Sequence, residues 1–209
     1  MRPHITHIIT GLPVGGAQTV LQQLVAERDA LGVDMSVISL TDEGPVGRAI
    51  MESGAKVRAL NLSMRAPNPL DILKMSKWLR EDRASLVQTW LYHADLLGGI
   101  AARLAGGIPV TWNLRNSDLN AGTSKKSTIW TMKSCALMSG FLPTSISCNS
   151  HAASRLHQEL GYRAKHIEII PNGVNLEKFR PDPAARTELR NSLGIADHEL
   201  VVGMAARFD

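Results

Sequence analysis

The sequence predicts an α/β protein in which helices cover both faces of a parallel sheet. Short apolar runs rich in β-branched residues alternate with segments whose apolar residues recur at helical spacing. Turns that contain glycine or proline separate most of these segments. Strands that alternate with helices form right-handed crossover units, which build a parallel sheet between two helical layers. We therefore expect a three-layer domain with a seven-stranded parallel sheet.

The strands are expected where short apolar runs carry β-branched residues. They cover residues 5–9, 33–40, 56–60, 86–90, 108–114, 144–148 and 166–170. Helices are expected between them, at residues 17–31, 46–52, 70–81, 94–105, 124–141 and 151–160. Helical spacing predicts that Leu31 in the first of these helices and Leu104 in the fourth face the core.

The end of the sequence changes in character. Residues 179–183 contain two prolines and favour a linker. A helix is expected at 184–193 and an eighth strand at 200–205. This strand is interpreted either as the start of a second domain or as an edge strand of the same sheet.

The composition indicates a soluble globular protein, with 44% hydrophobic and 20% charged residues. The net charge of +4 favours anionic partners such as phosphorylated ligands or a membrane surface. We expect no nucleic-acid partner, because no basic arm or nucleic-acid motif is present. Cys135 and Cys148 lack metal-ligand spacing, so we expect reduced thiols and a cytoplasmic protein. No apolar run reaches the roughly 20 residues that span a bilayer.

Ligands of parallel α/β sheets bind beyond the carboxyl ends of the strands. The loops expected there cover residues 12–16, 92–93, 115–122, 149–150 and 172–173. In the first loop, Gly15 and Gly16 immediately precede a helix. Glycines allow close approach of a ligand to the backbone, and the positive end of a helix favours an anion such as phosphate. The alternative is a tight strand-to-helix connection without a ligand.

Several of these segments, taken together and in order, resemble the retaining group-one glycosyltransferases of GT-B architecture. The segments are residues 15–18, 90–98, 112–118, 148–151, 170–174 with Phe179, and 202–209. The resemblance implies two Rossmann-like domains that face a cleft. The first receives the acceptor, and the second holds the nucleotide sugar and carries a glutamate pair. Residues 1–178 would be the acceptor-side domain, and residues 179–209 the linker and the start of the donor-binding domain. We expect these 209 residues not to turn over donor by themselves.

The implied activity is transfer of a sugar from a nucleotide-diphosphate sugar to an acceptor hydroxyl, with retention at the anomeric carbon. Surface polysaccharide or lipid-linked glycan synthesis is the expected setting. No metal ion or cofactor is expected, because the sequence lacks an Asp-x-Asp motif. Backbone amides and cationic side chains would then stabilise the departing diphosphate.

Arg115 and His93 are the candidate catalytic residues. Arg115 stands where many relatives have a histidine, and its planar guanidinium suits phosphate oxygens. Its alternative role is an ion pair with Asp118. His93 would contact the acceptor or the sugar hydroxyls, and otherwise would cap a helix or lie in solvent. Asp95, in the same helix, is interpreted as compensation of the helix dipole.

Further residues are expected to bind acceptor or donor. Asn149 and Ser150 have the alternative role of a helix N-cap, and Asn172 that of a turn residue at the interdomain crossover. Arg207 matches the family's arginine that contacts the donor diphosphate. The full set is Gly15, Gly16, Gln18, Asn113, Asn116, Asp118, Asn149, Ser150, Asn172 and Arg207.

The segment 124–141 combines three lysines with Trp130 and other apolar residues. A basic amphipathic helix of this kind can lie on an anionic membrane surface, on the inner face of the membrane. We favour the alternative, an ordinary covering helix with a solvated lysine face.

Three other functions compete with transfer. A GT-B-type sugar-nucleotide epimerase would release nucleotide without an acceptor. A nicotinamide-dependent enzyme is disfavoured, because the Gly-x-Gly-x-x-Gly fingerprint is missing. A non-catalytic sugar- or lipid-binding module remains the third alternative.

Overall fold

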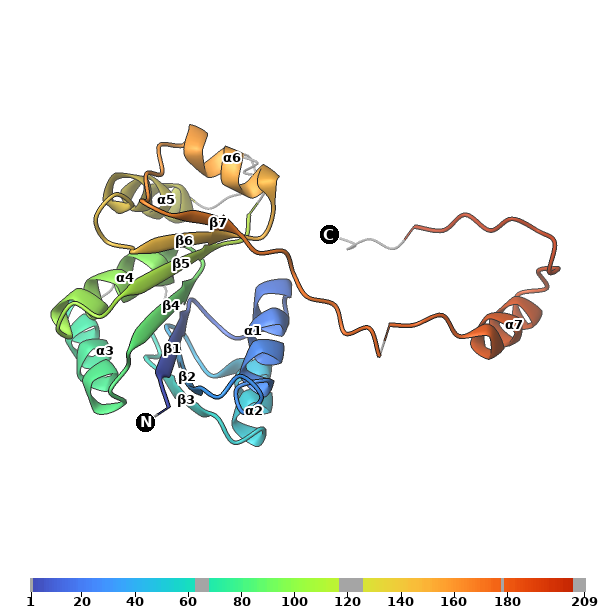
Figure 1. Ribbon diagram of the computed structural model, residues 1–209, viewed down its shortest axis with the longest axis horizontal. Helices are drawn as coiled ribbons and strands as arrows, with labels where there is room; N and C mark the ends of the chain where they lie inside the picture. Colours follow the sequence, from blue (N-terminus) through green and yellow to red (C-terminus); the bar gives the residue numbers. More distant parts are fainter. Residues whose placement is uncertain (1, 63–67, 117–125, 178, 205–209) are drawn as a thin grey trace. The chain divides into compact units, whose positions relative to one another are not determined.

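The computed structural model describes residues 2–62, 68–116, 126–177 and 179–204 (Figure 1). The chain divides into two compact units, Met1–Asn172 and Gly173–Asp209. Among the described residues, the first unit contains every strand and the first six helices, and the second contains helix α7 (Pro183–Ser192). The expected domain boundary between residues 178 and 179 stays a prediction.

The first unit is built on a seven-stranded parallel sheet in the order β3-β2-β1-β4-β5-β6-β7. This confirms the predicted fold class. The strand order reverses between β1 and β4, which lie side by side in the middle of the sheet. The strands are β1 (His4–Ile9), β2 (Asp34–Ser39), β3 (Lys56–Ala59), β4 (Leu86–Trp90), β5 (Val110–Leu114), β6 (Ser145–Cys148) and β7 (Ile167–Ile169).

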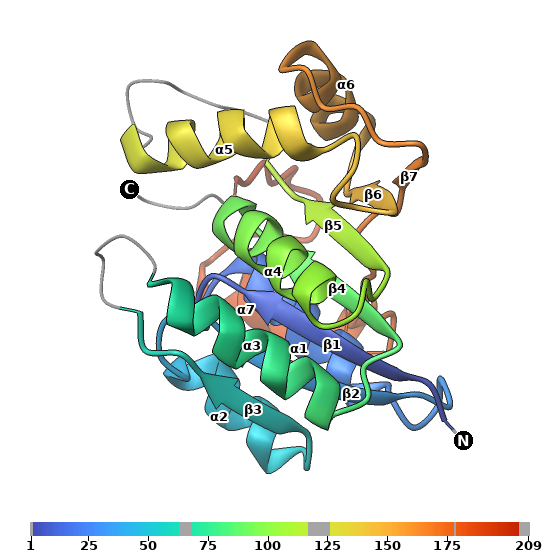
Figure 2. The same cartoon turned by 90° about the vertical axis from the view of Figure 1, so that its left-hand side faces the viewer.

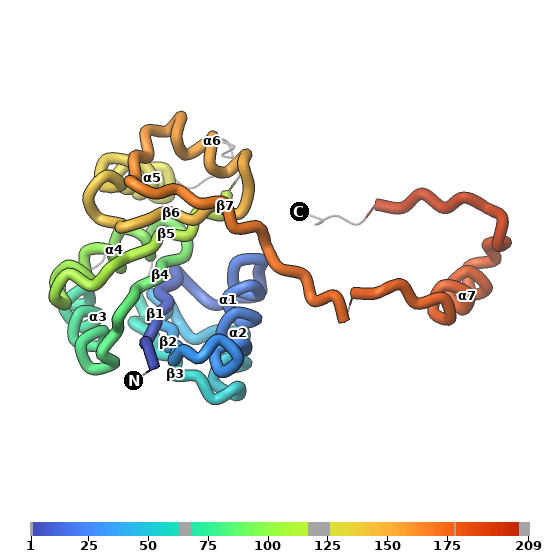
Figure 3. Tube along the Cα trace, viewed as in Figure 1, coloured from blue at the N-terminus to red at the C-terminus, as the bar shows by residue number. Residues whose placement is uncertain are grey.

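Helices cover both faces of the sheet. The helices are α1 (Gly16–Ala26), α2 (Gly44–Glu52), α3 (Pro69–Glu81), α4 (Tyr92–Leu104), α5 (Lys126–Met138) and α6 (His151–Glu159). α1 and α2 pack on one face, and α3 and α4 lie on the opposite face with α5 beside α4 (Figures 1 and 2). The Cα trace in Figure 3 shows each strand followed by a helix before the next strand begins.

Each central strand supplies apolar side chains to two separate cores. Ile8 packs in the core beneath α3 and α4, whereas the next residue, Ile9, packs in the core beneath α1 and α2. In β4, Val87 and Trp90 divide between the two cores in the same way. Because successive side chains of a strand point to opposite faces, a sheet covered on both faces needs continuous apolar runs.

α4 lies unusually close to the sheet at Gly98. A Cβ atom on Gly98 would lie 2.9 Å from Thr89 Cγ2 and 3.1 Å from Ile8 Cδ1. Buried Ala94 and Ala101 on the same helix also have small side chains. The small residues of α4 therefore set its distance from β1 and β4.

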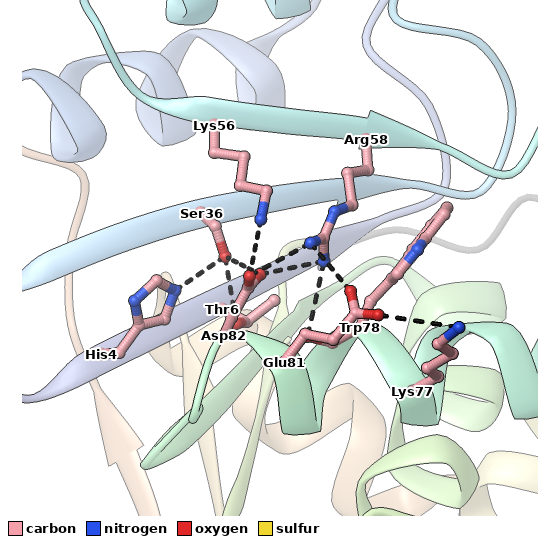
Figure 4. Close-up of polar contacts among 9 residues, drawn as sticks. All are labelled: His4, Thr6, Ser36, Lys56, Arg58, Lys77, Trp78, Glu81 and Asp82. Carbon is pink, nitrogen blue, oxygen red and sulfur yellow. Dashed lines mark hydrogen bonds and ion pairs between the residues drawn. The ribbon is translucent and has the colours of Figure 1, made fainter.

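A network of ion pairs and hydrogen bonds connects α3 to the sheet near the amino ends of the strands (Figure 4). Asp82, just after α3, is surrounded by Lys56 at 2.8 Å and by Arg58 at 3.1 and 3.2 Å. Ser36 Oγ donates to Asp82 Oδ2 at 3.4 Å, and His4 Nε2 lies 2.9 Å from Ser36 Oγ. A carboxylate with a 6% exposed side chain is compensated here by two cations. The network ties the end of α3 to β2 and β3.

Two core predictions at helix ends are wrong. α1 ends at Ala26, five residues earlier than expected, and Leu31 is 55% exposed in the turns that follow. Leu104 is 52% exposed in the last turn of α4. Helical spacing identifies a face of a helix, but a helix end can extend beyond the core that its middle contacts. The predicted cap of α6 is confirmed, because Ser150 Oγ accepts from the Ala153 amide at 3.1 Å.

The predicted eighth strand is not found in residues 200–204, the part of it that the structure describes. These residues form no helix and no strand, and the exposed fraction of Leu200 is 90%. A strand needs a hydrogen-bonded neighbour, and the described residues of the second unit contain no other strand. Apolar β-branched composition alone therefore did not produce a strand here.

Replacing Gly98 by alanine is expected to lower the free energy of unfolding by about 1–3 kcal/mol, because the new methyl group overpacks the contact between α4 and the sheet. Gly99→Ala is the matched control, since its Cβ would lie 3.5 Å from its nearest neighbours. The control should match the parent or gain up to about 1 kcal/mol from helix propensity. Urea unfolding followed by circular dichroism measures both variants, and equal stabilities would contradict the close packing.

Candidate functional site

The predicted site residues gather mainly at the carboxyl ends of four adjacent strands. The register places Ile9 beside Trp90, Trp90 beside Asn113, and Leu114 beside Cys148. The loops that follow β1, β4, β5 and β6 therefore begin next to one another. This edge lies at the topological switch point between β1 and β4, where open parallel sheets bind their ligands.

The glycine loop leads into an open helix N-terminus. Gly15 is the N-cap of α1, and no side chain caps this end of the helix. Gly16 is exposed, and a Cβ atom on it would have nothing within 4 Å. The backbone amides and the dipole of α1 thus present partial positive charge at an uncrowded position.

Gln18 stabilises the glycine loop through a buried hydrogen bond. Its side chain is buried, and Nε2 donates to the Gly11 carbonyl at 3.1 Å. A Cβ atom on Gly15 would lie 2.5 Å from Gln18 Oε1, so a side chain at position 15 would require the Gln18 amide to shift. The structure gives Gln18 a role within the loop, and its contact with a ligand stays a prediction.

Arg115 is half-buried at the end of β5, and its guanidinium lies over the face of the Trp90 indole at 5.3 Å from Cζ to the ring centroid. One guanidinium nitrogen donates to Asn172 Oδ1. The Asn149 side chain donates to the Arg115 carbonyl at 3.4 Å. Burial lowers the pKa of Arg115, but an arginine remains charged. The structure therefore brings together three predicted residues, Arg115, Asn149 and Asn172.

The sheet face on which Arg115 lies follows from its stacking partner. Trp90 belongs to the core beneath α1, together with Leu12 and Leu21. A guanidinium over Trp90 is therefore on the α1 side of the sheet. The cation of Arg115 and the positive end of α1 are both placed to meet an anionic ligand at this edge.

His7 and Trp90 form a buried pair that sequence analysis did not single out. Trp90 Nε1 donates to His7 Nδ1 at 3.4 Å, and both side chains are 1% exposed. Burial, assisted by the charge of His4, lowers the pKa of His7 to about 3, so that its imidazole is neutral at pH 7. His7 occurs within an apolar run and carries no motif. Trp90 could have been singled out, because it ends a strand at the ligand-binding edge.

The junction between β4 and α4 contains a backbone conformation that is rare for a residue with a side chain. Leu91 has φ of +74°, in the left-handed region. Two residues later, His93 is half-buried, and burial lowers its pKa, which favours the neutral imidazole. Such strained junctions are common at functional sites. The structure places His93 at the expected edge, and its role stays a prediction.

Asp95, interpreted as compensation of the helix dipole, lies in the first turn of α4 but not in solvent. Its side chain is fully buried and accepts from Thr89 Oγ1 at 2.6 Å. Burial raises the pKa of Asp95 well above its usual value, and the hydrogen bond from Thr89 only partly opposes this shift. A carboxyl group with a raised pKa is a poor counter-charge for a helix dipole. Asp95 belongs to the core.

The other predicted residues have separate positions. Asn113 is buried within β5. Asn116 hydrogen-bonds the Tyr92 hydroxyl, which partly offsets the effect of burial in raising the pKa of Tyr92 to about 12. Asp118 and Arg207 lie outside the described residues. Within the described part of the chain, no group of three His, Cys, Asp or Glu residues is arranged to hold a metal ion.

Comparison with known proteins places this chain in a family. The profile of Glycosyltransferase Family 4 matches residues 14–178. EpsF of Bacillus subtilis (strain 168), which is assigned as a glycosyltransferase, is 24% identical over 209 residues, or 98% of this chain and 54% of EpsF. The UDP-Gal:alpha-D-GlcNAc-diphosphoundecaprenol alpha-1,3-galactosyltransferase of Escherichia coli is 28% identical over 137 residues, or 65% of this chain and 35% of that enzyme.

Solved structures share the fold. Anabaena Alr3699/HepE, crystallised with UDP and glucose, has a TM-score of 0.70 at 19% identity, over 91% of this chain and 50% of HepE. A UDP-N-acetylglucosamine 2-epimerase has a TM-score of 0.56 at 10% identity, over 82% of this chain and 49% of the epimerase. The chain thus spans about half the length of EpsF and of HepE. Because the family profile covers most of the chain and the sheet matches these structures, the chain belongs to glycosyltransferase family 4 and has the Rossmann-like fold of the amino-terminal half of a GT-B glycosyltransferase.

Proposed function

We propose that this chain is the acceptor-side domain of a retaining glycosyltransferase, which moves a sugar from a nucleotide-diphosphate sugar to an acceptor hydroxyl. Membership of glycosyltransferase family 4 supports sugar transfer. The E. coli relative is named for a UDP-sugar donor and a diphosphoundecaprenol-linked acceptor. This name supports a setting in lipid-linked glycan or surface polysaccharide synthesis.

The observation that carries this proposal is the shared position of Arg115 and the N-terminus of α1. Both lie on one face of the sheet, at the carboxyl ends of β1 and β5, which flank β4. We assign them to the negative charge of the donor diphosphate. Preorganised amides and cations stabilise charge that develops in the transition state, without the cost of reorganising water. Transfer on this basis needs no metal ion.

Most donor contacts are proposed to come from a second domain, so activity is assayed on the full-length protein. Incubation with nucleotide sugars and a lipid-linked acceptor, with and without EDTA, tests transfer and its independence of metal. A GT-B-type epimerase is the second candidate, because an epimerase shares the fold. Epimerised sugar or free nucleotide formed without acceptor would favour the epimerase, and abolition of transfer by EDTA would contradict metal-free catalysis.

We also propose that the surface around α5 contacts an anionic lipid bilayer. The exposed fraction is 73% for Trp130, 82% for Leu137 and 56% for Phe141. The only acidic residue between positions 96 and 158 of the sequence is Asp118. A basic surface with exposed Trp, Leu and Phe is typical of interfacial helices.

Two shallow hollows flank the end of α5. One, of about 400 Å³, includes Arg103, Phe141 and Lys165, and the other, of about 550 Å³, includes Lys133 and Arg163. Cations in both hollows complement anionic phospholipid headgroups. The exposed face of α5 thus carries large apolar side chains beside its lysines, which favours membrane contact over a purely solvated lysine face. No helix in the described ranges is long and apolar enough to cross the bilayer itself.

Replacing Arg115 by glutamine in the full-length protein is expected to lower kcat/KM for transfer by about 10²-fold or more, because one cationic donor to the diphosphate is lost. Arg83→Gln makes the same charge change in the turn before β4, near the amino ends of the strands. This control should retain full activity. Equal activity of the two variants would remove Arg115 from the proposed chemistry.

Replacing Gly16 by alanine separates ligand approach from turn geometry. The added Cβ meets no atom of the chain within 4 Å, so the unfolding temperature should not fall. A ligand seated on the backbone would meet the new methyl group, and KM for donor or acceptor should rise at least several-fold. Unchanged kinetics would show that Gly16 serves only the turn.

The double variant Trp130→Ser, Leu137→Ser should lose most binding to phosphatidylglycerol vesicles in co-sedimentation. The matched control is Leu70→Ser, Leu73→Ser, which removes two leucines of 67% and 53% exposure from α3. It should bind like the parent. Binding of the parent to neutral phosphatidylcholine vesicles as strongly as to anionic ones would contradict the proposed role of the basic residues.

A further inference from the structure

We propose that Trp90 is a positioning residue for the transfer reaction, because the face of its indole holds the Arg115 guanidinium in the orientation that meets the donor diphosphate. This inference rests on the proposed function, in which Arg115 contacts the diphosphate. The Trp90 side chain is itself 1% exposed, so it would act through its contact with Arg115.

The Arg115 guanidinium contacts the face of the Trp90 indole. Arg115 Cζ lies 5.3 Å from the centroid of the Trp90 ring. This distance is within the range of cation–π attraction, which is strongest for tryptophan and increases when the cation is partly desolvated. Arg115 is half-buried, so its contact with Trp90 is partly shielded from water.

The indole is itself fixed at its N–H edge by a contact with a neighbouring strand. Trp90 Nε1 donates to His7 Nδ1 at 3.4 Å, and the two rings meet edge to face with centroids 6.1 Å apart. His7 belongs to β1, Trp90 to β4 and Arg115 follows β5, so the contact chain crosses three adjacent strands. A rigid sheet therefore defines the plane against which the guanidinium lies.

Arg115 also has a second contact, which limits the rotation of its side chain. Its bond to Asn172 Oδ1 fixes one edge of the guanidinium. A guanidinium has five N–H donors in a planar fork, so a bond to Asn172 is compatible with a two-point contact to a phosphate. With one face against the indole and one edge on Asn172, rotation about the long side chain is restricted. This lowers the entropic cost of placing the fork on an anion.

The test is a double-variant cycle in the full-length protein. Trp90→Leu keeps an apolar side chain but removes the aromatic face, and should lower kcat/KM about tenfold, equal to about 1.4 kcal/mol. In the Arg115→Gln background, the same change should alter kcat/KM less than about twofold, because its effect acts through Arg115. Trp90→Phe keeps an aromatic face and should recover most of the activity. Unfolding temperatures are measured for every variant.

A second readout needs neither donor nor acceptor. The Nε–H proton of Arg115 should be shifted upfield in the NMR spectrum of the parent by the indole ring current, and should return toward its ordinary position in Trp90→Leu. An unshifted signal in the parent overturns the inference. An equal loss of activity from Trp90→Leu in both backgrounds also overturns it and leaves the proposed function standing. If the parent shows the shifted Arg115 signal but transfers no sugar, the proposed function is wrong and the contact with Trp90 stands.

Discussion

The burial of the central sheet on both faces is the constraint on which the other features depend. Ile8 and Ile9 serve opposite cores, so the middle of the strands is occupied by apolar side chains. Exposed polar side chains are therefore found at the two ends of the strands. At the amino ends, the charge of Asp82 is compensated within the chain by Lys56 and Arg58. At the carboxyl ends, Arg115 and the N-terminus of α1 carry positive charge toward the loops, which makes this the edge suited to an anionic substrate.

The site combines rigid elements with groups that suit a diphosphate. Gln18 holds the glycine loop by its bond to the Gly11 carbonyl, and Trp90 supports the guanidinium of Arg115. The backbone donors and the cation are therefore positioned before any ligand arrives. This arrangement accords with membership of glycosyltransferase family 4 and with the proposed donor, whose departing diphosphate would carry charge that the site can stabilise. The basic and apolar surface around α5 is a separate feature, and it suits the lipid-linked acceptor proposed above.

The sequence was sufficient to predict the seven strands and their parallel arrangement, because a strand buried on both faces requires a continuous apolar run. It also predicted the Ser150 cap and the edge at which Arg115, His93 and Asn149 lie. It could not show which side chains of that edge turn inward. Gln18 is polar yet buried, and Asp95 is an acid inside the core; both depend on partners, Gly11 and Thr89, that only the folded chain supplies. Trp90 was predicted only as the end of a strand, and its contact with Arg115 depends on the neighbouring strand.

The pairing of β1 with β4 has a consequence for how the chain folds. The hydrogen bond from Ser85 to the His4 carbonyl joins residues 81 apart in sequence, and it lies in the middle of the sheet. Contacts of such long range slow folding, because a large loop must close before they form. During synthesis, β1 cannot pair with β4 until β4 has left the ribosome. Until then the edge of β1 that pairs with β4 stays unpaired in the nascent chain, and unpaired strand edges are prone to aggregation.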